Sequence, residues 1–353
     1  MTDLVVAGAG MAGLAAAAEA RELGADVVVH EKLDRAGGSM RLSSGYVWRH
    51  RELADFRAEC PRGDEALQRL VFERLDEDID WLERLGAPVL GRDTGNELTT
   101  GVRFDTAGLT AALERAAGDV RLADPLRAPL GDTPLVLATG GFAAGRDLLA
   151  DHVTDEAGEL MLRASPGNEG DGLRLGLEAG GRASAGLDEI YGRNMPAPPA
   201  RVPETDWVAL SQLYGRFAEI TNADGERYEA QTWSEIDVVQ WTAHQQRARA
   251  WFRVEDGRLG ERVRDRTVGE MVAAAEAAGA PVRRESGAVT VETVAGVTST
   301  LGGLAIDTRA RVAPGIHAAG GDAGGIATGG YSSGLAAALV LGRVAARAAL
   351  EAA

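Results

Sequence analysis

The chain has 353 residues, of which 45% are hydrophobic and 25% are charged, a composition that is ordinary for a globular protein with a sizeable core. This length allows two domains. The formal net charge is −16, so no basic face is expected for nucleic acid or an anionic membrane. The single cysteine, Cys60, excludes an internal disulfide and is expected to be a free structural thiol. We find neither a signal peptide nor an apolar run long enough to span a bilayer, and therefore expect a cytoplasmic location.

The start of the chain contains a glycine motif of the kind that binds dinucleotides. Residues 8–13 read G-x-G-x-x-G and follow the run 3–7, which predicts a buried parallel strand because its apolar residues are consecutive. An Ala-rich helix is predicted over 14–23 and a second strand over 25–31. The motif therefore stands in a complete βαβ unit, which is the context that makes it specific.

Each residue of this motif has its own expected task. Gly8 permits the tight turn, Gly10 lets the backbone approach a pyrophosphate, and Gly13 lets the helix pack closely on the strand. The helix N-terminus offers N–H groups and a partial positive charge to the phosphates. Glu31, at the end of the second strand, can accept hydrogen bonds from ribose hydroxyls, which favours an unphosphorylated dinucleotide such as FAD or NAD.

Two later stretches can also bring backbone close to a dinucleotide. Gly37 and Gly38 are followed by hydroxyl residues, which suits a loop whose backbone donors approach phosphate or flavin. A further apolar strand is predicted over 135–142, and it ends in A-T-G-G-F. Two glycines at that point give close access to the carboxyl edge of a parallel sheet, where ligands bind. A NAD dehydrogenase domain would not need the glycine pair at 37 and 38.

These motifs resemble those of the fumarate reductase and 3-ketosteroid dehydrogenase family of FAD proteins (FAD-binding domain type 2), of which the chain is expected to be a short member. The resemblance extends over nearly the whole chain. It rests on G-G-S at 37–39, S-S-G-Y-V-W at 43–48, A-T-G-G-F at 138–142, G-D-G at 170–172, T-S-T-L-G-G-L-A-I-D-T at 298–308, A-A-G-G-D-A-G-G at 318–325 and L-G-R at 341–343. It implies an α/β fold: a Rossmann-like FAD-binding domain formed by 1–187 and 299–353, with an α+β cap domain inserted at 188–298.

The composition of residues 188–298 supports a separate domain. This segment holds four of the six tryptophans and three of the five tyrosines, and it begins with the Pro-rich stretch 195–199. A strand, turn and strand are predicted over 220–228, and a helix over 267–279. The aromatic content of the cap suits a largely apolar substrate.

The resemblance implies that FAD is bound without a covalent link, because only His50 lies near the loop where some relatives attach their flavin. The residues expected to bind it are Gly8, Gly10, Met11, Ala12, Gly13, Glu31, Lys32, Gly37, Gly38, Ser39, Met40, Ser43, Ser44, Gly45, Ala138, Thr139, Gly140, Asp171, Gly320, Asp322, Ser332, Ser333 and Leu335.

Further elements follow from periodicity and capping. Helices are predicted over 65–85 and 104–117, and a short strand over 120–122. Asp171 stands at a helix start, where it is expected to cap the helix; by resemblance it also lies near the flavin. The Ala-rich C-terminal helix that follows 331–334 is expected to point its N-terminus at the flavin pyrimidine ring.

Two carboxylate-binding residues of the family's dicarboxylate reductases are missing. The resemblance places Ser299 where those enzymes have a substrate-binding His, and Gly329 where they have a substrate-binding Arg. A guanidinium pairs bidentately with a carboxylate, and glycine cannot. Fumarate or succinate is therefore not the expected substrate.

The ketosteroid dehydrogenase branch instead implies tyrosines around a ketone, one as base and one polarising the carbonyl oxygen. Tyr46, Tyr191 and Tyr331 are the candidates. Arg258 resembles the proton donor of the reductase cap, offset by one residue, with a solvated surface arginine as the alternative. With Ser299, these complete the candidate catalytic set. No spacing of His, Cys and carboxylates suggests a metal.

The expected function is FAD-dependent dehydrogenation or reduction of a C–C bond next to a carbonyl, with a hydride exchanged at flavin N5 and a Tyr or Arg moving the proton. The expected substrate is an apolar or cyclic carbonyl compound, and the external electron donor or acceptor stays open. The alternatives are a flavin-dependent hydroxylase or amine oxidase, or a flavin-binding subunit with little activity alone. The hydroxylases would have G-D-x-x-x-P near the C-terminus, and residues 321–325 lack the proline.

Overall fold

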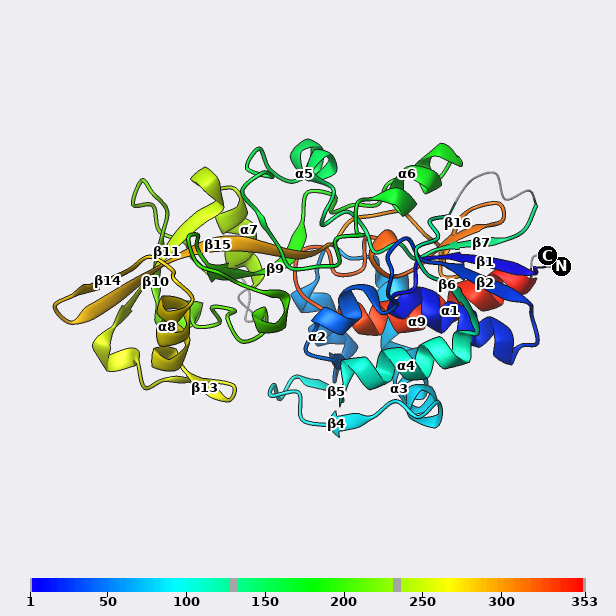
Figure 1. The fold of residues 1–353 in the computed structure, drawn as a ribbon, viewed down its shortest axis with the longest axis horizontal. Helices are drawn as coiled ribbons and strands as arrows, with labels where there is room; N and C mark the ends of the chain where they lie inside the picture. The colour runs from blue at the N-terminus through cyan, green and yellow to red at the C-terminus, as the bar shows by residue number, and fades with distance from the viewer. Residues whose placement is uncertain (1, 127–131, 231–235, 352–353) are drawn as a thin grey trace. The chain divides into compact units, whose positions relative to one another are not determined.

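A computed structural model describes residues 2–126, 132–230 and 236–351 of the chain. The chain forms two compact units (Figure 1). The first comprises Met1–Gly145, Ala164–Glu189 and Ser299–Ala353, and the second Arg146–Arg163 and Ile190–Thr298. Residues 146–163, which were expected in the first domain, thus group with the second unit.

The first unit is built on a six-stranded sheet with the strand order β16-β17-β7-β1-β2-β6. Its strands are β1 (Leu4–Ala7), β2 (Val27–His30), β6 (Asp119–Arg121), β7 (Leu135–Leu137), β16 (Arg311–Ala313) and β17 (Ile316–Ala318). All neighbours pair in parallel except β16 and β17. The apolar strands β1 and β7 are fully buried, which confirms the parallel βαβ arrangement that their uninterrupted apolar runs predict.

Helices pack around this sheet, and the predicted ones are confirmed with small shifts at their ends. They are α1 (Met11–Glu22), α2 (Leu53–Glu59), α3 (Glu65–Arg84), α4 (Thr106–Ala117), α6 (Asp171–Glu178) and α9 (Gly334–Glu351), with 3₁₀ turns at Gly38–Leu42 and Gly320–Asp322. The first helix starts at Met11, three residues earlier than expected, because the backbone already turns at the N-cap Gly10.

Helices α1 and α9 lie side by side (Figure 1) because α9 has a glycine at the point of contact. A Cβ on Gly342 would lie 2.3 Å from the carbonyl oxygen of Ala12. One residue on, the buried Arg343 Nε lies 2.6 Å from Glu19 Oε2 of α1, and the same guanidinium pairs with Asp78 of α3. A buried ion network of this kind fixes the register of three helices, since leaving one charge unpaired is costly.

A small antiparallel sheet in the first unit was not expected. Its order is β3 (Tyr46–His50), β5 (Thr99–Phe104) and β4 (Val89–Gly91). Residues 51–100 read as charged and helical, and only α2 and α3 fit that description. The pairing of Tyr46 with Arg103 holds the loop after Gly37 against α4.

The second unit is an α+β fold whose central strand is β15 (Ala288–Thr300). The main order is β10-β11-β15-β14, and β8 and β9 also pair with β15. The other strands are β8 (Met161–Leu162), β9 (Ile190–Pro196), β10 (Glu219–Thr221), β11 (Arg249–Glu255), β12 (Arg262–Val263), β13 (Arg266–Thr267) and β14 (Val282–Glu285). The helices are α5 (Arg146–His152), α7 (Ile236–Ala243) and α8 (Val268–Ala277), with 3₁₀ turns at Glu204–Asp206, Gly215–Phe217, Gln246–Ala248 and Asp256–Arg258.

Of the elements predicted in this unit, the helix over 267–279 is found nearly as expected, as α8. A reciprocal capping box between Thr267 and Glu270 starts helix α8. The predicted strand, turn and strand reduces to β10 and one isolated bridge between Thr221 and Arg227, so its second strand is wrong. No helix in the described part of the chain is long and apolar enough to cross a membrane.

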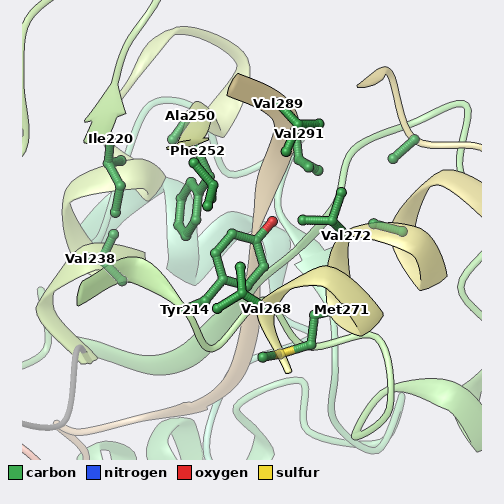
Figure 2. Packing of buried hydrophobic residues seen from close by; sticks show 13 residues of the cluster. Tyr214, Ile220, Val238, Ala250, Phe252, Val268, Met271, Val272, Val289 and Val291 are labelled. Atoms are coloured by element: carbon green, nitrogen blue, oxygen red, sulfur yellow. The ribbon is translucent and has the colours of Figure 1, made fainter. Parts of the chain in front are cut away.

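The core of the second unit closes around Tyr214 (Figure 2). The ring of Tyr214 is fully buried and meets the ring of Phe252 edge-on, with 5.7 Å between their centroids. Apolar side chains surround its hydroxyl, including Val272 and Val291, and within the described residues that oxygen has no hydrogen-bond partner. Burial raises the pKa of the phenol far above its usual range. Burying this hydroxyl therefore lowers the free energy of unfolding, because no hydrogen bond compensates for its lost hydration.

We expect Tyr214→Phe to leave the free energy of unfolding unchanged or to raise it by up to about 1 kcal/mol, because it removes an unpaired buried hydroxyl and keeps the ring. Urea unfolding followed by tryptophan fluorescence checks this. Phe252→Ala is the matched control and should cost about 3–5 kcal/mol through the cavity it leaves. Destabilisation by Tyr214→Phe of more than about 1 kcal/mol would show that the hydroxyl has a partner.

Candidate functional site

The three glycines of the first turn have different surroundings. Gly8 has a φ of +101°, and a Cβ there would lie 2.3 Å from the carbonyl oxygen of Ala138 on the neighbouring strand end. A Cβ on Gly13 would lie 1.8 Å from the carbonyl oxygen of Gly8. Around Gly10, in contrast, no atom lies within 4 Å of the Cβ position. Gly8 and Gly13 are thus packing positions, and Gly10 faces open space.

The N-terminus of α1 is open to an anion. Its N-cap, Gly10, has no side chain to cap the helix, and the first turn contains no acidic residue. The first N–H groups of a helix have no partner within it, and their partial positive charge favours phosphate. The turn from Gly10 through Met11 and Ala12 therefore fits the pyrophosphate of a dinucleotide.

Glu31 and Lys32 follow β2 and hold two neighbouring loops. The Glu31 carboxylate accepts from the backbone N–H of Ala9 at 2.8 Å and of Leu33 at 2.9 Å. A carboxylate has about four acceptor sites, so capacity remains for ribose hydroxyls. The Lys32 ammonium lies 2.7 Å from Asp171 Oδ2 and 2.8 Å from Glu169 Oε2.

The expected capping role of Asp171 is wrong. The N-cap of α6 is Gly170, in a left-handed conformation with a φ of 90°, and no side chain caps the helix. Asp171 is instead the first residue of the helix, and its carboxylate pairs with Lys32. Its place near the flavin stays a prediction.

The glycine-serine loop is fixed mainly through its own hydroxyls. Ser39 Oγ accepts from the backbone N–H of Ser165 at 2.9 Å and from Asn168 Nδ2 at 3.1 Å. Ser43 Oγ donates to the carbonyl oxygen of Met40 at 2.7 Å and accepts from the Gly45 N–H at 3.1 Å. These serines thus shape the loop. The glycine-rich stretch gave no sign of the part played by Asn168.

Asp322 joins the strand end at 139–141 to the C-terminal segment. Its fully buried carboxylate accepts from the Thr139 N–H at 2.5 Å, from Thr139 Oγ1 at 3.0 Å and from the Gly141 N–H at 2.9 Å. Thr139 Oγ1 in turn accepts from the Gly172 N–H at 2.9 Å. Burial raises the pKa of Asp322, although these hydrogen bonds oppose the shift.

The neighbouring glycines allow this convergence of backbones. A Cβ on Gly140 would lie 2.5 Å from Asn168 Oδ1, and one on Gly320 would lie 3.0 Å from the side chain of Ala12. Gly320 thus touches the first turn of α1. Ala138, directly after β7, is buried against the same turn because its N–H donates to the Ala7 carbonyl at 2.8 Å. The predicted cofactor residues from three distant segments meet at the carboxyl edge of the sheet.

The start of α9 brings two candidate tyrosines into one region. Ser333 Oγ accepts from the Ala336 N–H at 3.3 Å, so it caps the helix, and it donates to the Tyr46 carbonyl at 3.4 Å. The ring of Tyr331 lies 5.4 Å from that of Trp48, two residues beyond Tyr46. Ser332, Leu335 and Tyr331 are partly exposed.

The remaining catalytic candidates do not lie in this region at the start of α9 or are not placed against it. Ser299 is partly exposed where the chain returns to the first unit. Tyr191 and Arg258 belong to the second unit, where Tyr191 lies under the guanidinium of Arg193 at 5.6 Å. Arg258 is 55% exposed and lies 3.5 Å from Glu261, as the surface alternative predicts. Cys60 is buried, which raises the pKa of its thiol and fits a structural role. Among the described residues, no group of three or more His, Cys, Asp or Glu side chains could hold a metal.

The parallel sheet, the glycine turn and the acidic residue after β2 define a Rossmann-like dinucleotide-binding protein. The chain matches the model of the FAD binding domain family over residues 3–123 and 126–335. It therefore belongs to that family, and FAD is its cofactor, as the sequence motifs predict.

Known proteins of two kinds are similar to this chain. The Shewanella frigidimarina "Fumarate reductase (cytochrome)" is 24% identical over 275 residues, which are 64% of this chain and 47% of that protein. The chain thus spans about half the length of such curated relatives. The open conformation of a flavocytochrome c3 fumarate reductase superposes with a TM-score of 0.74 at 20% identity, covering 99% of this chain and 78% of the other. The 3-ketosteroid-Δ4-(5α)-dehydrogenase of Rhodococcus jostii RHA1 superposes with a TM-score of 0.71 at 19% identity, covering 99% of this chain and 96% of the other. These likenesses confirm the predicted fold.

We expect Gly10→Ala to leave the fold intact and to weaken FAD binding at least about tenfold, since its Cβ would enter only the space that the pyrophosphate needs. Titration of the apoprotein with FAD, followed by flavin fluorescence, measures this. Gly257→Ala is the matched control, because its Cβ position is equally open but lies in the second unit. Unchanged FAD affinity in Gly10→Ala would remove Gly10 from the cofactor site.

Proposed function

We propose that this chain is a FAD-dependent oxidoreductase that forms or reduces a C=C double bond next to a carbonyl group. The observation that supports it most is the pairing of a FAD-binding family match with structural relatives named for fumarate reduction and for ketosteroid dehydrogenation. Both names describe reactions at a carbon–carbon bond beside a carbonyl carbon. Bound FAD supplies the two-electron chemistry, and the chain supplies binding, orientation and proton transfer.

The proposed substrate is an apolar, cyclic carbonyl compound and not a simple dicarboxylate. Ser299 and Gly329 stand where the resemblance puts a His and an Arg that hold carboxylates, and neither side chain can form such an ion pair. Two ketosteroid dehydrogenases share the fold with TM-scores of 0.71. A ketone needs hydrogen-bond donors at its oxygen and no opposite charge.

Tyr331 is the proposed proton-transferring residue, and Tyr46 is the second candidate. Tyr331 is partly exposed, and its ring is held against Trp48 on β3. It stands just before α9, whose N-terminal partial charge favours negative charge nearby. A phenol can hold or release a proton at its oxygen while the ring stays fixed.

Flavin is proposed to be bound without a covalent link. Acid precipitation of the holoprotein should therefore release all flavin absorbance into the supernatant. Flavin that stays with the pellet and on the denatured polypeptide in a gel would contradict this, and would point to His50 as the residue to replace next.

The reaction is tested with the FAD-loaded protein under anaerobic conditions. Saturated cyclic ketones should bleach the flavin, or cyclic enones should reoxidise the reduced protein, whereas succinate and fumarate should do neither. Tyr331→Phe should slow the active reaction about 10²–10⁴-fold at unchanged FAD content, because it removes the proton donor or acceptor. Tyr46→Phe is the comparison that tells which tyrosine acts.

Other outcomes distinguish the alternatives. Faster reaction with fumarate or succinate than with any ketone or enone would contradict the proposed substrate class. Rapid oxygen consumption driven by NADH or NADPH would favour a hydroxylase. Tight FAD without turnover by any donor or acceptor would favour a flavin-binding subunit, which the half-length match to the curated reductases also allows.

A further inference from the structure

Two backbone segments of the first unit are hydrogen-bonded to each other, and this pairing fixes the position of Arg62. The segment 59–64 lies along the glycine-rich segment 325–330. The Arg62 N–H donates to the Thr328 carbonyl at 3.2 Å, and the Asp64 N–H donates to the Gly325 carbonyl at 2.7 Å. A Cβ on Gly330 would lie 1.7 Å from the Glu59 carbonyl oxygen, so the two backbones are in direct contact. Arg62 is thus on a rigid support, although its side chain is 64% exposed.

The buried carboxylate of Glu189 holds the guanidinium. The Glu189 side chain is 8% exposed, and its Oε1 lies 2.9 Å from Arg62 Nη2. Its Oε2 accepts from the Gly329 N–H at 2.6 Å, and its backbone carbonyl accepts from the Leu301 N–H at 2.9 Å. Glu189 therefore ties Arg62 to both segments of the chain that return to the first unit. One edge of the guanidinium pairs with Glu189, and donors on its exposed side remain for a ligand.

Gly329 leaves room for this arginine. It has a φ of +89°, and a Cβ there would lie 3.2 Å from Arg62 Nε and 3.3 Å from Pro61 Cδ. Any side chain at 329 would be strained and would crowd the guanidinium. The position at which the sequence comparison finds an arginine missing is therefore the position against which the side chain of Arg62 lies.

The surroundings of the pair are polar and next to the proposed catalytic tyrosine. Thr328 is 2% exposed, and within the described residues its Oγ1 has no hydrogen-bond partner. Thr328 Oγ1 and Glu189 Oε1 lie 3.0 and 3.5 Å from the same point, the Cβ position of Gly186. The Tyr331 N–H donates to the sulfur of Cys60, two residues before Arg62. The backbone at Tyr331 thus lies beside the segment that carries Arg62.

We propose that Arg62, held in place by Glu189, donates hydrogen bonds to the carbonyl oxygen of the substrate and selects neutral carbonyl compounds over carboxylates. This inference rests on the proposed function and deepens it. The ion pair is neutral as a whole, so it offers N–H donors without a net positive charge. A carboxylate would meet the negative charge of Glu189, whereas a ketone oxygen needs only the donors.

Binding to the oxidised holoprotein tests this without turnover. The probes are the enone 1-acetylcyclohexene and cyclohex-1-ene-1-carboxylate, which have the same ring and carbonyl position and differ mainly in charge, and the readout is the perturbation of the flavin absorbance band. Arg62→Ala should weaken binding of the enone about tenfold or more, and Arg62→Lys should restore part of it. Arg69→Ala is the matched control, since Arg69 is 51% exposed and paired with Glu65 in the same unit, and it should change nothing.

Glu189→Gln separates recognition from a structural role. The glutamine oxygen can still accept from Gly329, but the pair gains one positive charge. Binding of the carboxylate probe should then strengthen about tenfold relative to the enone, a reversal that loss of packing would not produce. Equal FAD content in every variant shows that the fold is retained, and Arg62→Gln replaces Arg62→Ala if that variant loses flavin.

The two proposals fail in different ways. If the wild type reacts with cyclic ketones or enones but Arg62→Ala and Glu189→Gln bind both probes as the wild type does, the role of Arg62 is overturned and the proposed function stands. If the wild type binds neither probe and reacts with no carbonyl compound, both proposals fall.

Discussion

The buried carboxylate of Asp322 is the interaction on which the cofactor edge depends. A fully buried carboxylate is costly unless several donors surround it, and here Thr139 and Gly141 supply three. These donors are available to Asp322 because β7 stops at Leu137 and the last bond to β1 is made by the Ala138 N–H, one residue before Thr139. Asp322 therefore replaces the missing strand hydrogen bonds. It binds the end of β7 to a segment far along the chain, and the edge is preformed.

Backbone contacts, and not long side chains, bring the rest of this edge together. Gly13 rests on the Gly8 carbonyl and Gly342 on the Ala12 carbonyl, so β1, α1 and α9 approach within distances that a Cβ would forbid. The network of Arg343, Glu19 and Asp78 then fixes the helices behind the turn. The residues predicted to hold the cofactor lie in turns and at helix ends, so we expect side chains elsewhere to vary without loss of FAD.

The sequence predicts this half of the molecule well because its signals are local. Unbroken apolar runs gave β1 and β7, and the glycine spacing gave the turn at Gly10. The antiparallel sheet of β3, β4 and β5 was missed, since its strands are short, the stretch 51–100 around them is rich in charged residues, and its pairing joins distant segments. The cap at Asp171 was wrong because Gly170 is the N-cap and Asp171 is already the first residue of the helix, where its carboxylate pairs with the distant Lys32. The ion pair of Arg62 and Glu189 corresponds to no sequence motif, because its two residues are also far apart in the sequence.

Some glycines of this fold contact backbone and others contact only side chains, and this difference suits a fold that keeps its cofactor while its substrate varies. Positions such as Gly8 and Gly13 tolerate no side chain, so the FAD edge resists change. Gly329 touches only the flexible side chain of Arg62 and the edge of Pro61, so an arginine can be lost there and supplied from another segment. The new guanidinium comes with the buried Glu189, which cancels its charge. Under the proposed role of Arg62, moving the arginine in this way would keep a donor near Gly329 and remove the attraction for carboxylates, so the substrate class would change while the fold does not.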